Sequence, residues 1–336
     1  MSGRRGVNGH SGDMTMRRRE FGLTLLSAAL VPAASRAMDN HPVRLVVPFV
    51  PGGGNDLYAR LYAEPLGALL KCPVIVENKS GASGNIGAEV VVHAAPDGHT
   101  LLYASSSIAV NPFILPQMPF DTERDLLPLS LMLSQPYVMV VRADQNARDL
   151  SGYLDRLRRD KPPVNFGSQG AGSSSAMVTA QMFKRAGIAD VTHVPYRGAG
   201  QLLTAILAGD VQVAFMIWPV AKPFIDAGQL VPLAVSGSSP MEQLPGIPTL
   251  DSGGFPGLIA DQWHGFFLPR KTPPAVVREL YEALAATVRL PQIAERLRAD
   301  GATAVASTPE EFATFFAAEL KRWKGIVDNL GVKLKE

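Results

Sequence analysis

The chain has 336 residues, which is enough for two domains of ordinary size and a substantial hydrophobic core. Hydrophobic residues make up 46% of it and charged residues 18%, which excludes general disorder. The formal net charge of +2 argues against nucleic acid as a partner. The single cysteine, Cys72, excludes an internal disulfide framework and a metal site built from cysteines.

The N-terminal segment has the order of an export signal. Arginines at 17–19 precede a mostly apolar run at 23–31, and small residues follow at the positions that a signal peptidase reads. Arg18-Arg19-Glu20-Phe21 is typical of a twin-arginine signal. We predict that residues 1–37 are a cleavable signal peptide and that the mature protein begins near Met38 in the periplasm. The alternative interpretation is a disordered tail with an apolar stretch.

A proline-bracketed glycine loop at 48–56 follows the first predicted strand, at 43–47, and precedes a predicted helix at 57–63. Its three glycines permit positive φ and keep side chains away from anything that docks there. The first amides of a helix have no internal partners, and the helix dipole places partial positive charge at that end. Such a turn suits an oxyanion. We predict that it binds the carboxylate of a small organic acid without catalysis.

The same alternation of strand, polar loop and helix recurs along the chain. Residues 78–87 and 105–107 are serine-rich loops after predicted strands, and the loop at 168–175 repeats the opening arrangement in the second half. Residues 111–128 are rich in proline and predict an irregular surface loop. Alternation of this kind is typical of a parallel sheet with helices on both faces, where ligands bind beyond the carboxyl ends of the strands. Further strands are predicted at 73–77, 100–104, 137–141, 164–167, 191–194, 211–215, 230–235 and 263–268, and further helices at 88–95, 149–159, 176–186, 201–208, 274–288, 291–300 and 309–330.

Motifs of catalytic sites are incomplete in this sequence. The first glycine loop lacks the lysine and hydroxyl residue that end a nucleotide-binding P-loop. Asn85 stands where the last glycine of a nucleophile elbow would follow Ser83. His93 and His99 flank a turn without metal-ligand spacing, and His193 and His264 are interpreted as core or strand residues. We therefore predict no enzyme activity, no metal ion and no cofactor.

With these features the chain resembles the extracytoplasmic solute receptors of tripartite tricarboxylate transporters. The resemblance implies an α/β, two-lobed periplasmic-binding-protein-like (type II) fold with a ligand cleft between the lobes. We expect residues 38–142 and 262–336 to form lobe 1 and residues 143–261 to form lobe 2. The segments that carry the resemblance, in this order and spacing, are 48–56, 76–87, 167–174, 193–200, 247–254, 263–268, Thr272-Pro273 and Gly331-Val332-Lys333.

The resemblance also implies the binding residues. In the family, a carboxylated ligand is held mainly by backbone amides and hydroxyls from the strand-to-helix loops of both lobes. Transferred by motif, the predicted ligand-binding residues of lobe 1 are Gly52, Gly53, Gly54, Asp56, Ser80, Ser83, Ser105, Ser106 and Ser107. Those of lobe 2 are Ser168, Gly170, Ala171, Gly172, Ser173 and Ser174, with Tyr196 and Arg197 nearby. Two further predicted ligand-binding residues are Phe49, in the first loop, and Trp218, where this chain departs from the family.

Several of these residues also have simpler structural explanations. Asp56 is as well suited to capping the following helix as to touching a ligand. Arg197 is as well suited to a salt bridge between lobes. The family often has an aspartate shortly after the position of Phe215, where this chain has Met216-Ile217-Trp218, and its absence argues against an ammonium-bearing ligand. Trp218 either stacks on a planar acid or packs in the core.

We therefore expect a monomeric periplasmic solute-binding protein that captures a small carboxylate for uptake by a tripartite tricarboxylate-type transporter. Its partners would be the ligand and the membrane transporter subunits, and its lobes would close because the ligand touches both. One alternative is a ligand-sensing receptor for a signalling partner. Another is a serine hydrolase of a carboxylated ester that uses Ser173 or Ser174. Aliphatic di- or tricarboxylates, aromatic acids and acidic amino acids all stay open as ligands, and the missing aspartate disfavours the acidic amino acids.

Overall fold

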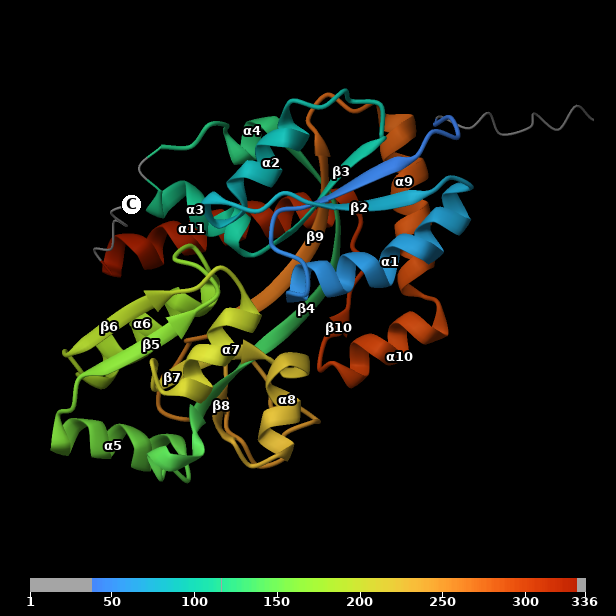
Figure 1. Cartoon of the computed structure of the whole chain (residues 1–336). Coiled ribbons are helices and arrows are strands. Elements are labelled where there is room, and N and C mark those ends of the chain that lie inside the picture. Colours follow the sequence, from blue (N-terminus) through green and yellow to red (C-terminus); the bar gives the residue numbers. More distant parts are fainter. Residues whose placement is uncertain (1–37, 116, 331–336) are drawn as a thin grey trace, which may run out of the picture. The chain divides into compact units, whose positions relative to one another are not determined.

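The computed structural model describes residues 38–115 and 117–330 (Figure 1). The predicted signal peptide, residues 1–37, and the closing segment from Gly331 lie outside the described residues. Among the helices described, none is long and apolar enough to cross a membrane. The predicted α/β fold is confirmed, and its strands fall into two sets that we call lobe 1 and lobe 2.

Lobe 1 contains the first predicted strands in parallel. β1 (Val43–Val47) pairs with β2 (Val74–Asn78) on one side and with β3 (Thr100–Ser105) on the other. β3 then pairs with β9 (Asp261–Pro269), which runs antiparallel to it and to β4 (Leu126–Arg142). The remaining elements of this lobe are α1 (Gly54–Leu70), η1 (Ala82–Gly84), α2 (Asn85–Val92), α3 (Ser107–Ile114), α4 (Thr122–Asp125), α9 (Pro274–Val288), α10 (Pro291–Ala299) and β10 (Thr303–Ala304).

Lobe 2 repeats this parallel arrangement. β5 (Val164–Ser168) lies between β6 (Val191–Pro195) and β7 (Val213–Ile217) and is parallel to both. β7 and β8 (Leu230–Val235) both pair antiparallel with the end of β4. The remaining elements are η2 (Ala143–Gln145), α5 (Leu150–Asp160), α6 (Ser174–Ala186), α7 (Ala199–Ala208) and α8 (Trp218–Asp226).

The two lobes share the long strand β4. Residues 126–136 of β4 pair with β9 of lobe 1, whereas residues 137–142 pair with β7 and β8 of lobe 2. The change of pairing partner therefore falls at Pro136, six residues before the lobe boundary at residue 142 that composition indicated. The exact boundaries of the lobes stay a prediction. The C-terminal helix α11 (Pro309–Leu330) packs against α3, α6 and β4, so it also contacts both lobes.

The prediction of an irregular loop at residues 111–128 is wrong for most of the segment and holds for residues 115 and 117–121, which have neither helix nor strand. This segment contains the end of α3, all of α4 and the start of β4. Its prolines were interpreted as breakers, but Pro112 lies inside α3, and Pro128 lies in β4 beside a shift in the pairing register. Such an irregularity accommodates a residue that has no N–H to donate to the ladder. Helix α8 was not predicted. It contains one proline in its first turn, where no internal hydrogen bond is lost, and a second, Pro223, inside the helix.

Burial determines the protonation state of a histidine in an aromatic cluster of lobe 1. His264 of β9 is fully buried, and its ring packs edge-on against Tyr58 and Tyr103. Burial lowers the pKa of His264 to about 3, so the imidazole is neutral. Its Nδ1 lies 3.2 Å from the Tyr103 hydroxyl. The interpretation of His264 as a core residue with one satisfied hydrogen bond is confirmed.

Candidate functional site

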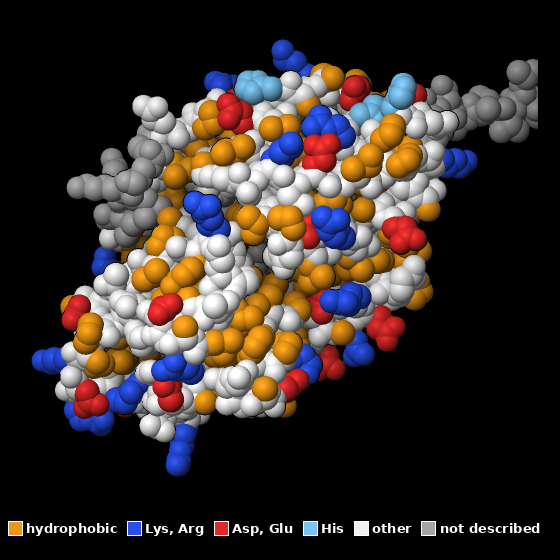
Figure 2. Space-filling model, in the orientation of Figure 1, with side chains coloured by type: hydrophobic (Ala, Val, Ile, Leu, Met, Phe, Trp, Pro, Cys, Tyr) orange, Lys and Arg blue, Asp and Glu red, His pale blue; other side chains and the backbone are white. Residues whose placement is uncertain are grey.

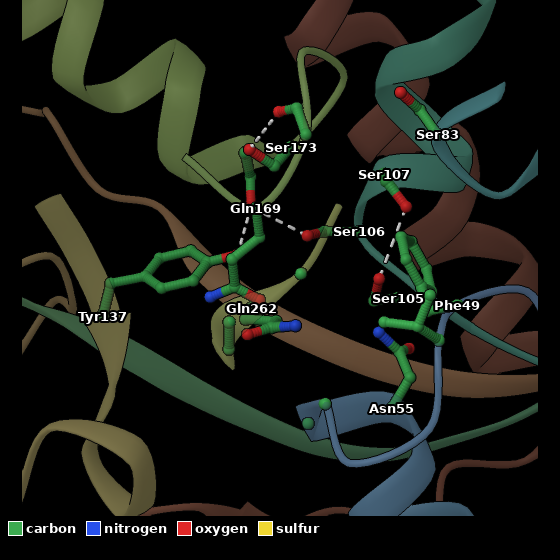
Figure 3. A pocket seen from close by; sticks show the side chains of 17 residues that line it. Phe49, Asn55, Ser83, Ser105, Ser106, Ser107, Tyr137, Gln169, Ser173 and Gln262 are labelled. Carbon is green, nitrogen blue, oxygen red and sulfur yellow. Dashed lines mark hydrogen bonds between the residues drawn. The ribbon is translucent and has the colours of Figure 1, made fainter. Parts of the chain in front are cut away.

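A small cavity lies where the first turns of four helices from both lobes meet (Figure 3). The residues that line it from these turns are Gly53 and Gly54 (α1), Ser106 and Ser107 (α3), Ser173 and Ser174 (α6), and Gly198 and Ala199 (α7). Each helix start carries amides without internal partners and partial positive charge. The cavity is therefore suited to an anion.

The cavity wall carries no formal charge. Among the described residues that line it there is no lysine, arginine, aspartate or glutamate. The other lining residues are Phe49, Val50, Asn55, Ser83, Ser105, Tyr137, Gln169, Gly170 and Gln262. An anion bound here would be stabilised by oriented amide dipoles and hydroxyl groups instead of by a counter-ion.

Three amide side chains of the wall have polar atoms without a hydrogen-bond partner among the described residues. These atoms are Asn55 Oδ1, Gln169 Nε2 and Gln262 Oε1, and both Asn55 and Gln262 are buried. Buried polar atoms are normally hydrogen-bonded, because desolvation without a partner costs free energy. Since an amide can be turned to present either its oxygen or its NH₂ group, all three can accept or donate to a ligand.

Hydroxyl groups join the two lobes across the cavity. Ser106 Oγ of lobe 1 lies 2.8 Å from Ser174 Oγ of lobe 2, which lies 2.9 Å from the Tyr137 hydroxyl on the shared strand β4. Burial raises the pKa of Tyr137 to about 12, so this hydroxyl stays protonated. The free volume is about 30 Å³, whereas one water molecule needs about 10–15 Å³ on this measure. The cavity by itself therefore has room for about two water molecules and not for a whole organic acid.

A wider groove of about 540 Å³ adjoins the cavity. The two share Phe49, Val50, Ser83, Gln169 and Gly170, so the groove continues outward from the same loops. Its volume falls in the range of about 300–1,000 Å³ that is usual for ligand sites. The groove adds Ser80, Tyr196 and Arg197 to the accessible polar groups.

Comparison with known proteins decides the family. Residues 58–332 match the model of the tripartite tricarboxylate transporter family receptor. The chain belongs to this family. It is 31% identical to BugT of Bordetella pertussis, over 96% of this chain and 100% of that protein.

Two solved structures are similar to this receptor. One is R. palustris Rpa4515 with adipate, at a TM-score of 0.83 and 28% identity, covering 87% of this chain and 98% of that one. The other is MatC (Rpa3494) from Rhodopseudomonas palustris with bound malate, at a TM-score of 0.78 and 28% identity, covering 85% and 99%. The expected periplasmic-binding-protein-like fold and the resemblance to these receptors are both confirmed.

Most of the predicted site residues line the cavity or the outer groove. In the cavity wall lie Phe49, Gly53, Gly54, Ser83, Ser105, Ser106, Ser107, Gly170, Ser173 and Ser174. In the outer groove lie Ser80, Tyr196 and Arg197, the last with no ion pair among the described residues. Outside both lie Gly52, Asp56, Ser168, Ala171, Gly172 and Trp218. Figure 3 shows Phe49, Asn55, Ser105 and Ser107 on one side of the cavity and Tyr137, Gln169 and Ser173 on the other.

Asp56 supports the first glycine loop from behind. Its carboxylate accepts hydrogen bonds from Gly52 N at 2.9 Å, Arg60 Nε at 3.0 Å and Asn78 Nδ2 at 2.9 Å. Burial alone would raise the pKa of Asp56, but the hydrogen bonds from Arg60, Gly52 and Asn78 outweigh burial and lower it. Asn78 also donates to the Phe49 carbonyl at 3.0 Å. Asp56 therefore shapes the loop and does not reach the cavity.

Ser168, the last residue of β5, supports the loop of lobe 2. Its hydroxyl donates to the Gly170 carbonyl at 2.8 Å and lies 2.7 Å from His193 Nε2. Burial lowers the pKa of His193 to about 4, so this imidazole is neutral. Ser173 Oγ donates to the same carbonyl at 2.7 Å and accepts from Ala176 N at 3.2 Å, which caps α6. These bonds hold the second loop in the shape that presents Gly170 and Ser173.

Two other predicted residues are excluded from the cavity by packing. A Cβ atom on Gly172 would lie 2.2 Å from Asn111 Oδ1 and 3.2 Å from Ser83 Cβ, so this glycine permits close approach of the lobes. Trp218 is buried in the core of lobe 2, with Lys222 Nζ 5.7 Å from its ring centre. Its position does not support the predicted stacking on an acid.

Several cavity residues were not predicted, namely Val50, Asn55, Tyr137, Gln169, Gly198, Ala199 and Gln262. Val50, Asn55 and Gln169 lie inside loops that were predicted as binding loops, so their neighbours carried a signal for them. Tyr137 and Gln262 lie on β4 and β9, where no local motif distinguishes a strand residue that faces the cavity.

Replacing Asp56 by Asn tests the support of the glycine loop. We expect Asp56→Asn to lower the free energy of unfolding by about 1–3 kcal/mol at neutral pH, because charge-assisted hydrogen bonds are lost. The pKa of Asp56 is lower in the native state than the value near 3.8 for the unfolded chain, so its ionised carboxylate stabilises the fold at pH values above 3.8. This stabilisation is lost as the pH falls through the native-state pKa. The difference in urea midpoint between the two proteins should therefore narrow as the pH falls below 3.8.

Asp226→Asn is the matched control. Asp226 forms an exposed ion pair with Lys222 on α8, and such pairs contribute about 0–1 kcal/mol. The supporting role of Asp56 would be contradicted if Asp56→Asn changed the free energy of unfolding as little as Asp226→Asn does. It would also be contradicted if the change caused by Asp56→Asn did not depend on pH.

Proposed function

We propose that this receptor captures a small aliphatic dicarboxylate in the periplasm for uptake by a tripartite tricarboxylate-type membrane transporter. The observation that carries the proposal is the meeting of four helix starts from two lobes at one uncharged cavity. One carboxylate would bind the amides and hydroxyls of this cavity. The rest of the acid would extend into the outer groove, where the exposed Arg197 can pair with a second carboxylate. The similar structures with adipate and with malate support this ligand class.

The contacts available are sufficient for such a ligand. Micromolar affinity requires about 8 kcal/mol. Hydrogen bonds to a charged group contribute roughly 1.5–3 kcal/mol each, and a partly buried helix start up to about 2 kcal/mol. Three or four donors and two helix starts can therefore supply a free energy of this size, from which the cost of ordering the ligand and the lobes is subtracted.

A hydrolytic role is less well supported by the same geometry. A serine nucleophile needs an adjacent base such as an imidazole. The neighbours of Ser174 Oγ are the hydroxyls of Ser106 and Tyr137, and Ser173 Oγ donates to a backbone carbonyl. His193 contacts Ser168 instead.

Charges of both signs are scattered over the face shown in Figure 2, without a continuous basic surface. This distribution and the net charge of +2 favour a small ligand over nucleic acid on that face.

The first test is a direct binding measurement. Titration calorimetry of the purified protein with adipate and with malate should give a micromolar dissociation constant for at least one of them or for another dicarboxylate in a screen. Adipamide, which keeps the chain length but has no charge, should not bind. Binding of no carboxylate, or equal binding of adipamide, would overturn the proposal. Loss of uptake of the bound acid when the gene is deleted distinguishes transport from sensing.

Ala199 allows the contribution of one helix start to be measured. Ala199→Pro removes the first N–H of α7, a position where proline is well tolerated. We expect ligand affinity to fall by about tenfold or more while the melting temperature is maintained. Ala199→Gly keeps the N–H and should bind nearly as the wild type does. Equal ligand affinities of the proline and glycine variants would show that the first N–H of α7 does not contribute to binding.

We propose export by the twin-arginine route, on the basis of Arg18-Arg19-Glu20-Phe21. Replacing Arg18 and Arg19 together by lysine should leave the precursor inside the cell, as measured by immunoblotting of the periplasmic fraction. Arg17→Lys is the control and should be exported normally. Normal export of the double variant would exclude this route.

A further inference from the structure

A cluster of metal-ligating side chains lies at the opposite edge of the lobe 1 sheet from the cavity. The cavity lies beyond the carboxyl ends of the parallel strands, whereas Asp39 and His41 precede β1 and His99 directly precedes β3. β1 and β3 are parallel, with Arg44 opposite Thr100, and Arg44 N donates to the His99 carbonyl at 2.8 Å. The register of this pair therefore brings together residues that are far apart in the sequence.

The Asp39 carboxylate lies between the two imidazoles. Its Oδ2 is 2.7 Å from His41 Nδ1, and its Oδ1 is 2.9 Å from His99 Nε2. One ligating atom from each of the three residues lies within 4.8 Å of the other two. Two imidazole nitrogens and one carboxylate oxygen form a donor set that is typical of zinc sites with an open position.

One member of the cluster is fixed and two can adjust. The His99 side chain is 16% exposed, and its backbone is held on both sides: the backbone N–H donates to Asp97 Oδ1 at 2.9 Å, and the carbonyl accepts from Arg44 N. The side chains of Asp39 and His41 are 59% and 79% exposed and lie ahead of the first strand. Zinc–ligand bonds of about 2.0–2.1 Å place ligating atoms about 3.3 Å apart in a tetrahedron. The two nitrogen–oxygen distances of 2.7 and 2.9 Å are shorter than this value, and the three ligating atoms lie within 4.8 Å of one another. An ion would therefore enter between groups that now contact each other, through a small movement of the two exposed side chains.

We propose that Asp39, His41 and His99 bind Zn²⁺ or a chemically similar divalent transition-metal ion. The sequence prediction of no metal site considered His93 as the partner of His99, because the two flank one turn. The strand register instead gives His99 two partners from the segment ahead of β1. A bound ion would tie this first segment of the mature chain to the start of β3.

Zinc titration of the purified protein, without a polyhistidine tag and after removal of metals with a chelator, tests the site. Calorimetry should show one zinc ion per chain with a micromolar dissociation constant. His41→Ala should weaken binding by at least about tenfold, because one of three protein ligands is lost. Since His41 is exposed, this variant should keep the wild-type melting temperature in the absence of metal. Zinc should raise the melting temperature of the wild type more than that of the variant.

Two further variants complete the test. Asp39→Asn should also weaken zinc binding, and His93→Ala, which removes an exposed histidine outside the cluster, should leave it unchanged. Absence of micromolar zinc binding by the wild type, or equal binding by His41→Ala, would overturn the proposal and would mean that Asp39 only forms ion pairs with the two histidines. No organic acid enters these measurements, so their outcome is independent of the proposed function.

Discussion

The amides at a helix start that lack partners within the helix are the constraint on which this receptor depends. Four helices, α1, α3, α6 and α7, begin at one cavity whose described wall has no charged side chain. Partial charges spread over several amides attract an anion without holding it by a single strong ion pair. This arrangement is compatible with a receptor that must bind its ligand and also release it, because no one contact dominates the affinity.

The shared strand β4 connects this cavity to both lobes. Tyr137 follows the residue at which β4 changes partners, and its hydroxyl contacts Ser174 of lobe 2, which contacts Ser106 of lobe 1. A hydroxyl group can donate one hydrogen bond and accept others. The same three side chains can therefore pair with each other or with a carboxylate, so that a ligand in the cavity would replace contacts that here join the two lobes.

The shape of the binding loops is maintained by residues that do not face the ligand. Asp56 and Asn78 hold the glycine loop of lobe 1, and Ser168 with His193 holds the loop of lobe 2. Each lobe thus has a polar network behind its loop, and such networks are stable only where each member is satisfied. Predictions by motif assigned Asp56 and Ser168 to the ligand, because loop residues that position a site occur in the same motifs as residues that touch it.

The sequence by itself determined the strand, glycine-serine loop and helix units, and with them most of the hydroxyls and glycines of the cavity. These features are local, since they depend on hydrophobic periodicity, helix capping and the conformational freedom of glycine. Only the tertiary structure decided that Tyr137 and Gln262 face the cavity, that Trp218 does not, and that His99 lies beside Asp39 and His41. The reason is that strand register and lobe packing join residues that are distant in the chain, and no local pattern records which distant residue will be the neighbour.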